Sequence, residues 1–511
     1  MTASSRPSEL EPALEAVVAA ADHAAPAFAA TLPDQRARAL VRVADALEAA
    51  KEHLVGIAMR ETGLTEARLS GEVTRTAVQL RLFADTIVDG AYLDARIDHA
   101  DPEFVLGVRP DIRRTHLPLG PVINFSASNF PFAFSVLGGD SAAILAAGCP
   151  LIVKAHSGHP ELSDATAELA VQALAEAGMP AGVFHLIHGR EAGVEVLKDP
   201  RIKAGSFTGS IHVGRLLADI AATRPAPIPF FGELGSVNPV FITAAAVTER
   251  ADEIATGYLA SVSGSAGQLC TKPGFVFVPQ GSGLDDAVRR HQATLPEHRL
   301  LDPRIARSYA ERRDAILASR GVRTVLEGGI RFDAEGQGWT TPTVVTVSLD
   351  DFRAGYRELV DEAFGPLSII VETPAGTDLA ALMPEFYEGN LSGTLHLSSE
   401  EASGETANAP ELHALVAAIA RQVGRVLFNG WSTGVAVTPA QQHGGPWPAT
   451  TNDSSTSVGT AAIARFQRPV AFQNAPAAFL PAALRDDNPA GIPQSVSPAG
   501  ESREWGTRFA G

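Results

Sequence analysis

The spacing of apolar residues in the first part of the chain is helical. In LPDQRARALVRVADALEAAKEHLVGIAMRETG (32–63), apolar side chains recur every three or four positions, as they do along one face of a helix. We predict helices over residues 8–90, with Asp34 as the N-cap of this segment and Gly63 as its end. Residues 101–117 instead alternate between apolar and polar and are broken by prolines, which is typical of an edge strand or a protruding hairpin.

Between residues 120 and 222, short apolar runs alternate with helical patterns. The predicted strands cover 120–127, 149–156, 183–189 and 202–210. The predicted helices cover 132–148, 159–178, 191–200 and 211–222. Apolar strands that alternate with helices indicate a doubly wound α/β domain with a parallel sheet. Ligands of such sheets bind at the carboxyl ends of the strands.

A second α/β stretch is predicted over residues 237–430. Residues 456–476 mix strand and turn signals, and the tail after residue 484 is rich in proline and glycine and is predicted to be loose. Because 511 residues exceed what one hydrophobic core accommodates, we expect about three domains or lobes.

Composition narrows the possible partners and the compartment. The formal net charge is −17 and no block is rich in lysine or arginine, so neither nucleic acid nor an anionic membrane is an expected partner. The N-terminus lacks a basic stretch followed by an apolar one, and no run of 18 apolar residues occurs. The two cysteines, Cys149 and Cys270, show neither metal-ligand nor disulfide spacing. We therefore expect a cytoplasmic protein without a metal.

Three residues stand out as candidates for chemistry. Cys270 lies in the glycine-rich segment GSAGQLCTKPG, whereas Cys149 follows LAAG and is the better core candidate. A lone cysteine is more commonly inert than nucleophilic, so this pattern alone leaves both interpretations open. Glu233, in GELG, is either an exposed turn carboxylate or a base for water. Asn129, in SNFP, either caps the following helix or donates to a developing oxyanion.

Other residues indicate a nucleotide site. Gly209, Ser210 and Gly214 in FTGSIHVG begin a predicted helix, where a pyrophosphate can bind. Lys154 and Ser157 in VKAHSGHP follow a predicted strand, where a ribose can lie. Each of these signals is weak when it is taken alone.

Together the motifs resemble the aldehyde dehydrogenase superfamily. They occur in its order and rough spacing: SNFP (128–131), VKAH (153–156), FTGS (207–210), GELG (232–235), GQLC (267–270) and DEAFGP (361–366). The resemblance covers about residues 8–480. It implies a cofactor-binding domain (1–100 and 118–236, with a return near 431–455), a catalytic domain (237–430), an oligomerisation arm (101–117 and 456–484) and a tail (485–511).

The resemblance is closest to the branch of α-ketoglutarate semialdehyde (2,5-dioxovalerate) dehydrogenases and NADP-dependent fatty aldehyde dehydrogenases. The segments RLSGEVTRTAVQLRLFA (68–84), NGWSTGV (429–435) and HGGPWPATTNDSSTSVGTAAIARFQRPVAFQN (443–474) carry it. Trp431 and Trp447 depart from the phenylalanines expected there. Both are expected to border the substrate tunnel, which leaves the substrate size open.

The resemblance implies a role for each candidate. Cys270 attacks an aldehyde, the Asn129 side-chain amide and the Cys270 N–H hold the oxyanion, and Glu233 activates the water that releases a carboxylic acid. Glu362 and Phe364 hold the nicotinamide ribose and ring.

The cofactor preference follows from one position. NAD-preferring relatives place a glutamate three residues after the strand-end lysine, whereas this chain has Ser157 after Lys154. A carboxylate repels a 2′-phosphate and a hydroxyl donates to it, so we predict NADP with NAD tolerated. Arg190 either joins this site or is a solvated residue at a helix start.

Alternatives remain open for substrate and role. α-Ketoglutarate semialdehyde is the predicted substrate, and a fatty aldehyde or an aromatic or xenobiotic aldehyde is the rival. A catalytically silent binding or structural protein is the alternative from another class, which the joint presence of Asn129, Glu233 and Cys270 disfavours. The arm implies a homodimer or homotetramer.

Overall fold

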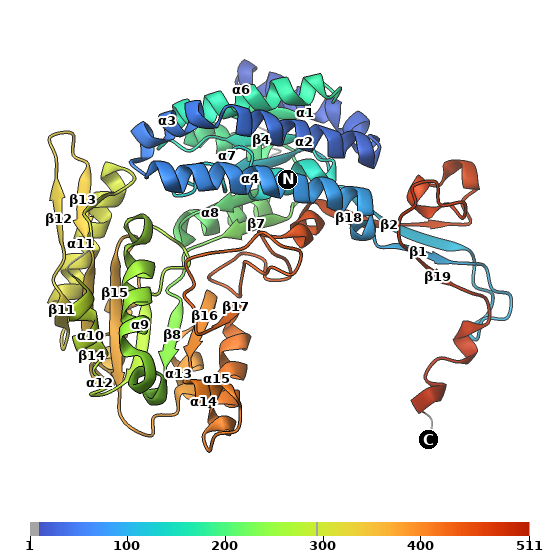
Figure 1. The fold of residues 1–511 in the computed structure, drawn as a ribbon. Coiled ribbons are helices and arrows are strands. Elements are labelled where there is room, and N and C mark those ends of the chain that lie inside the picture. Colours follow the sequence, from blue (N-terminus) through green and yellow to red (C-terminus); the bar gives the residue numbers. More distant parts are fainter. Residues whose placement is uncertain (1–9, 293–294, 510–511) are drawn as a thin grey trace, which may run out of the picture.

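The computed structural model describes residues 10–292 and 295–509 (Figure 1). The first helices of this part of the chain are α1 (Pro12–Ala29), α2 (Pro33–Ala49), α3 (Lys51–Thr62) and α4 (Glu66–Asp89). They confirm the predicted helical region, of which residues 8 and 9 lie outside the described residues. The predicted N-cap Asp34 is wrong: the cap is Leu32, because Pro33 has the backbone angle of a first helical residue. Gly63 ends α3 with φ 70°, as predicted.

The first sheet is fully parallel and lies under these helices (Figure 1). Its strands are β3 (Val122–Phe125), β4 (Leu151–Lys154), β5 (Phe184–Ile187), β6 (Ala204–Thr208) and β7 (Phe230–Glu233). The helices between them are α5 (Asp140–Ala147), α6 (Pro160–Glu176), α7 (Arg190–Lys198) and α8 (Ile211–Thr223). The spatial order of the strands is β5-β4-β3-β6-β7. From β3 the chain adds β4 and β5 on one side, and it then adds β6 and β7 on the other side. A ligand crevice is expected at the carboxyl ends of β3 and β6, where this switch occurs.

One predicted helix is shorter than its pattern. The apolar run 132–148 is helical only over α5, and residues 131–139 form turns instead. Gly138 explains the difference: a Cβ there would collide with the carbonyl groups of Phe132 and Ala133. The chain therefore folds back on itself before α5 begins, and this turn follows directly on the loop that carries Asn129.

The second sheet is built from later residues and has the order β11-β14-β15-β9-β8-β16-β17. Its strands are β8 (Pro239–Ile242), β9 (Phe275–Pro279), β11 (Arg323–Leu326), β14 (Thr343–Ser348), β15 (Leu367–Thr373), β16 (Asn390–His396) and β17 (Val423–Phe428). Its helices are α9 (Ala244–Ser263), α10 (Leu284–His291), α11 (Pro303–Ala318), α12 (Leu349–Leu359), α13 (Leu379–Phe386), α14 (Ser399–Ala402) and α15 (Ala409–Gln422). A small antiparallel sheet, β10 (His298–Arg299), β12 (Gly329–Phe332) and β13 (Gly338–Thr341), flanks it.

A third sheet forms an arm that projects from the body (Figure 1). It has the order β18-β2-β1-β19, with β1 (Ala95–Asp98), β2 (Ile112–Pro118), β18 (Gln467–Gln473) and β19 (Gln494–Ser497). The predicted loose tail is wrong here, because β19 pairs in parallel with β1. Arg109 also donates to the Ser497 and Pro498 carbonyls and pairs with Glu501.

These observations confirm the predicted fold class of two doubly wound α/β units and a small β arm. The boundaries of the cofactor-binding, catalytic and oligomerisation parts as functional domains stay a prediction.

Candidate active site

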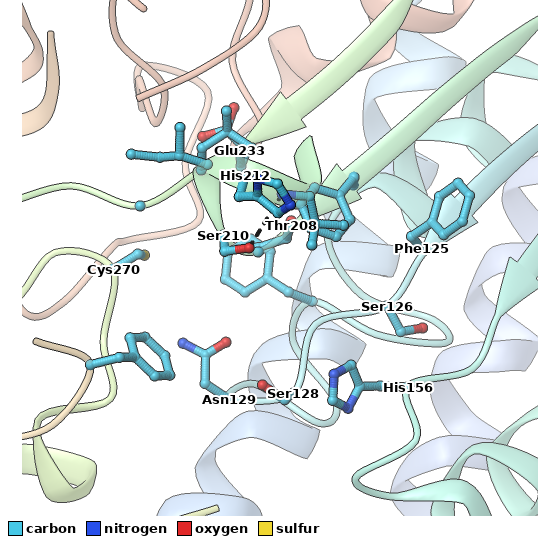
Figure 2. A pocket seen from close by; sticks show the side chains of 18 of the residues that line it. Phe125, Ser126, Ser128, Asn129, His156, Thr208, Ser210, His212, Glu233 and Cys270 are labelled. Carbon is cyan, nitrogen blue, oxygen red and sulfur yellow. Dashed lines mark hydrogen bonds between the residues drawn. The ribbon is translucent and has the colours of Figure 1, made fainter. Parts of the chain in front are cut away.

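The predicted site residues meet at one cavity of about 780 Å³ (Figure 2). Those that line it are Asn129, Lys154, Ser157, Arg190, Gly209, Ser210, Glu233, Cys270, Glu362 and Phe364. Gly214 is the exception: it lies in α8, and a Cβ there would collide with the Leu234 side chain. Its predicted contact with a pyrophosphate is therefore corrected to a packing role. Ser210 is the N-cap of α8, and its hydroxyl accepts a hydrogen bond from the Val213 N–H.

A strained loop presents Cys270 to this cavity. Ser265 and Ala266 both have φ 53°, and Gly267 has φ 66° with the Gly365 backbone packed where a Cβ would be. Left-handed backbone at non-glycine residues is costly and is maintained only by surrounding contacts. The Asn238 side chain supplies such a contact, because its Nδ2 donates to the Cys270 carbonyl at 2.8 Å.

His443 is the imidazole beside the thiol, and our sequence analysis gave it no role. Its Nε2 lies 3.9 Å from Cys270 Sγ, and its side chain is buried. Burial, and then the charges of Arg425, Arg75 and Arg465, lower the pKa of His443 to about 3. The site thus holds a neutral imidazole within reach of the sulfur.

The Cys270 thiol is also neutral in the free protein. Burial raises the pKa of Cys270 to about 12, and the charges of Glu362 and Glu233 act in the same direction. Cys149, by contrast, is fully buried in the core, where its Sγ–H donates to the Phe466 carbonyl. The prediction that Cys149 is a core residue is confirmed.

Glu233 is buried rather than exposed to water, so the interpretation as an exposed turn carboxylate is wrong. Glu233 is the last residue of β7, and its side chain is 3% exposed. Its Oε1 accepts a hydrogen bond from Arg465 Nη2 at 2.8 Å. Arg465 also pairs with Asp140 at 3.1 Å. Burial raises the pKa of Glu233 to about 7, although Arg465 opposes that rise. Its Oε2 faces His443 Nδ1 at 4.0 Å.

Asn129 lines the same cavity as Cys270 (Figure 2). It does not cap the following helix, since the N-cap of α5 is Gly139. Its Nδ2 donates to the Gln268 carbonyl at 3.0 Å, which uses one of the two amide protons and leaves the other for a ligand. Arg68, which lies on α4, donates a hydrogen bond from Nη2 to the Asn129 carbonyl at 2.9 Å.

Glu362 approaches the same cavity from the second sheet. Its Oε2 lies against Gly235, where a Cβ would come within 2.5 Å, so the second glycine of GELG makes room for this carboxylate. Burial raises the pKa of Glu362 to about 7, and the positive charge of Lys272 counteracts this. Lys272 itself donates to the Leu367 carbonyl at 2.5 Å.

A cluster of cations lines part of the same cavity. Lys154 ends β4 and Arg190 begins α7, and both line the cavity with Ser157. Arg304, which our sequence analysis missed, joins them from α11 and donates to Ser157 Oγ at 3.3 Å. The pKa of Lys154 is lowered by burial and then by the charges of Arg190 and Arg304. Like charges that lie this close favour an anionic ligand.

The two tryptophans lie outside the lining of this cavity. Trp431 stacks at a tilt on Tyr258 and His396, with centroid distances of 5.5 and 4.7 Å. The Arg215 guanidinium lies 5.5 Å from the Trp447 ring. Whether they border a substrate tunnel stays a prediction. In the described ranges, no cluster of three or more His, Cys, Asp or Glu is arranged for a metal, and no helix is long and apolar enough to cross a bilayer.

The chain matches known proteins over most of its length. Residues 5–445 match the model of the aldehyde dehydrogenase family. α-Ketoglutaric semialdehyde dehydrogenase 2 of Azospirillum brasilense is 41% identical over 465 residues, 90% of this chain and 86% of that protein. α-Ketoglutaric semialdehyde dehydrogenase of Acinetobacter baylyi is 38% identical over 475 residues, 91% of this chain and 87% of that protein.

Solved structures support the same fold. The NAD-dependent aldehyde dehydrogenase of Sinorhizobium meliloti superposes with a TM-score of 0.74 at 23% identity, over 92% of this chain and 88% of that one. An NADP-dependent enzyme of Escherichia coli superposes with a TM-score of 0.72 at 22% identity, over 90% of each chain. The chain belongs to the aldehyde dehydrogenase family, whose members use NAD or NADP, and this confirms the family resemblance.

Proposed function

We propose that this protein oxidises α-ketoglutarate semialdehyde to α-ketoglutarate, with NADP as the preferred cofactor and NAD tolerated. The observation that carries the reaction type is the cavity shared by Cys270, Asn129 and Glu233, with His443 beside the sulfur. The substrate rests on the two relatives named α-ketoglutaric semialdehyde dehydrogenases, which are 41% and 38% identical to this chain.

The first step forms a bond between Cys270 sulfur and the aldehyde carbon. His443 accepts the thiol proton as the bond forms, because its imidazole is neutral and 3.9 Å from Sγ. The carbonyl oxygen becomes an oxyanion that the remaining Asn129 amide proton and the Cys270 N–H hold. Losing one such donor raises the barrier by about 3 kcal/mol.

The residues around the cavity fit a nicotinamide dinucleotide. Gly209 and Ser210 at the start of α8 suit the pyrophosphate, and Glu362 and Phe364 suit the nicotinamide ribose and ring. When bound, the cofactor supplies the hydride acceptor for oxidation of the aldehyde carbon, which leaves an acyl thioester on Cys270. The volume of about 780 Å³ is in the range of small-molecule and cofactor pockets.

Glu233 then acts as the base that hydrolyses the thioester. Its pKa near 7 suits a group that must take a proton from water at neutral pH. Arg465 orients the carboxyl group through Oε1 and leaves Oε2 on the side of His443. The product is the free carboxylic acid, and the Cys270 thiol is restored.

The cation cluster supports the preference for NADP. Ser157 stands where a glutamate would repel a 2′-phosphate. Arg304 donates to its hydroxyl, and Lys154 and Arg190 line the same cavity. A phosphate would accept hydrogen bonds from the hydroxyl and the guanidinium groups, and it would relieve the repulsion among the cations.

The arm supports assembly into a homodimer or homotetramer. Its 101–109 loop exposes Leu106 at 86% and Val108 at 77%, apolar side chains that a second copy would cover. We propose that the chain is divided into a cofactor-binding domain, a catalytic domain and this oligomerisation arm.

The decisive measurement compares kcat/KM for α-ketoglutarate semialdehyde with that for a long-chain aliphatic aldehyde, followed by NADPH formation. We expect a preference of about a hundredfold for the dioxo acid, equivalent to ~2.7 kcal/mol. The opposite preference would make this a fatty aldehyde dehydrogenase and would leave the catalytic assignments intact.

A further inference from the structure

Arg75 lies beside Phe134, one of the side chains that line the cavity with Cys270. It projects from α4, and its guanidinium carbon is 5.1 Å from the centroid of the Phe134 ring. Phe134 lines the cavity and packs edge-on against His443, with a centroid distance of 6.2 Å. His443 in turn contacts the Cys270 sulfur. Arg75 is thus one aromatic side chain away from the imidazole that contacts the sulfur.

Arg75 has no partner of its own in the described part of the chain. It forms no hydrogen bond and no ion pair there, and its Nη1 is buried without an acceptor. Arg68 lies about two turns earlier in the same helix, and unlike Arg75 it has polar partners. Its guanidinium lies over Phe130 at 4.6 Å, but it is paired with Glu72 at 2.8 Å and bound to the Asn129 carbonyl.

Arg425, a second cation near the sulfur, already holds main-chain groups. Its Nη1 donates to the Gly434 carbonyl at 2.6 Å, and its Nη2 donates to the Ser432 carbonyl at 2.7 Å. Of these three cations, Arg75 is therefore the one that makes no hydrogen bond in the described part of the chain, although Arg68 also leaves its Nη1 without an acceptor. Burial lowers the pKa of Arg75, and the neighbouring Glu72 carboxyl opposes that shift, so an added anion would stabilise the guanidinium further.

We propose that Arg75 binds the carboxylate of the substrate and selects short aldehydes that carry a carboxylate at the far end. A guanidinium presents paired N–H donors that match the two oxygens of a carboxylate, and a partly buried charge gains most from such a partner. The molecule as a whole carries a net charge of −17, so an anionic substrate requires a local cation of this kind. This inference rests on the proposed function and names the residue that recognises its substrate.

The test is the ratio of kcat/KM for α-ketoglutarate semialdehyde to kcat/KM for pentanal, a neutral aldehyde with the same number of carbons. In Arg75→Gln we expect this ratio to fall about a hundredfold, mainly through KM, because a hydrogen-bonded charge pair is lost. Arg75→Lys should recover part of the ratio because it keeps the charge. Arg81→Gln is the matched control, since Arg81 lies on the same helix in exposed pairs with Asp45 and Glu48.

An unchanged ratio in Arg75→Gln would overturn the assignment, as would an equal loss for both aldehydes. A wild-type protein that prefers pentanal would instead overturn the proposed substrate.

Inhibition of the wild-type protein tests the same site without any variant. We expect 2-oxopentanoate, which has the acid end but no aldehyde, to compete with pentanal at a concentration at least about tenfold below that of 2-pentanone. Equal inhibition by the two compounds would show that no cation recognises the carboxylate. This comparison decides the inference even where Arg75→Gln does not fold.

Discussion

His443 Nε2 lies 3.9 Å from Cys270 Sγ, and both groups are neutral in the free protein. The pKa of His443 is about 3 and that of Cys270 is about 12, because desolvation in the site disfavours the charged form of each group. The pair therefore does not rest as a thiolate and an imidazolium. In the proposed first step, the thiol would lose its proton as the aldehyde carbon takes the electron pair of sulfur, and the neighbouring imidazole is placed to receive that proton.

This relationship predicts the effect of His443→Gln. We expect the initial burst of NADPH to slow by about 10²-fold or more, because a positioned base is lost from the step that forms the carbon–sulfur bond. Rapid-mixing absorbance at substrate saturation measures this. His188→Gln is the control, since His188 is an exposed partner of Asp164 and is not among the residues that line the cavity. A normal burst in His443→Gln would remove the imidazole from the proton transfer.

Glu233→Gln should give the complementary result. The burst of NADPH should persist while steady-state turnover falls by about 10²-fold or more, because acylation does not need this base and hydrolysis does. In the wild-type protein, burial raises the pKa of Glu233 to about 7, and only the carboxylate form accepts a proton. Hydrolysis should therefore rise with pH through about 7 and be lost below it. A pH profile of steady-state turnover checks this, and a burst lost along with turnover would contradict the assignment.

Arg465 joins Glu233 to Asp140 in a buried cluster, and its removal should cost stability. We expect Arg465→Met to lower the free energy of unfolding by about 3–5 kcal/mol, because two buried carboxylates lose their counterion. Urea unfolding followed by tryptophan fluorescence measures this. Arg485→Met is the control, since Arg485 pairs with Asp487 at the surface and should cost at most about 1 kcal/mol. Equal costs in the two variants would show that the buried cluster does not stabilise the fold.

The alternation of apolar strands and helices was enough to predict β3, β4, β5 and β6 of the first sheet. That a ligand binds at the carboxyl ends of these strands stays a prediction. The predicted helix 132–148 was too long, because the chain folds back on itself before α5. The apolar run there has a helical composition, but the close backbone approach at Gly138 rules out a helix, and local sequence does not show that approach. The tail was predicted to be loose for a related reason. β19 is a strand because β1 offers it an edge, and no local pattern shows that pairing.

The candidate site was predicted for those residues that carry a motif. Cys270, Glu233 and Asn129 each lie within three residues of a glycine or proline, a signal that the local sequence displays. His443, Arg465 and Arg304 come from segments far away in the chain, and they reach the site only through the packing of the two sheets. The one available signal was that His443 and Arg465 both lie within the segment 443–474 that carried the resemblance.

The cation cluster yields a prediction about cofactor choice. Ser157→Glu should shift the preference from NADP towards NAD, because a carboxylate would repel a 2′-phosphate and pair with Arg304 instead. Arg304→Gln should raise KM for NADP by about tenfold with little change for NAD, because one guanidinium partner of the phosphate is lost.

Initial rates against each cofactor at a saturating aldehyde concentration measure both effects. The control is Arg307→Gln, on the same helix, whose guanidinium lies by Gly336 in the β12–β13 hairpin. If Ser157→Glu leaves the ratio of kcat/KM for the two cofactors unchanged, Ser157 does not face the adenosine ribose. The 2′-phosphate would then bind elsewhere in the cavity. Variants of Lys154 and Arg190 would have to be tested as its partners in place of Arg304.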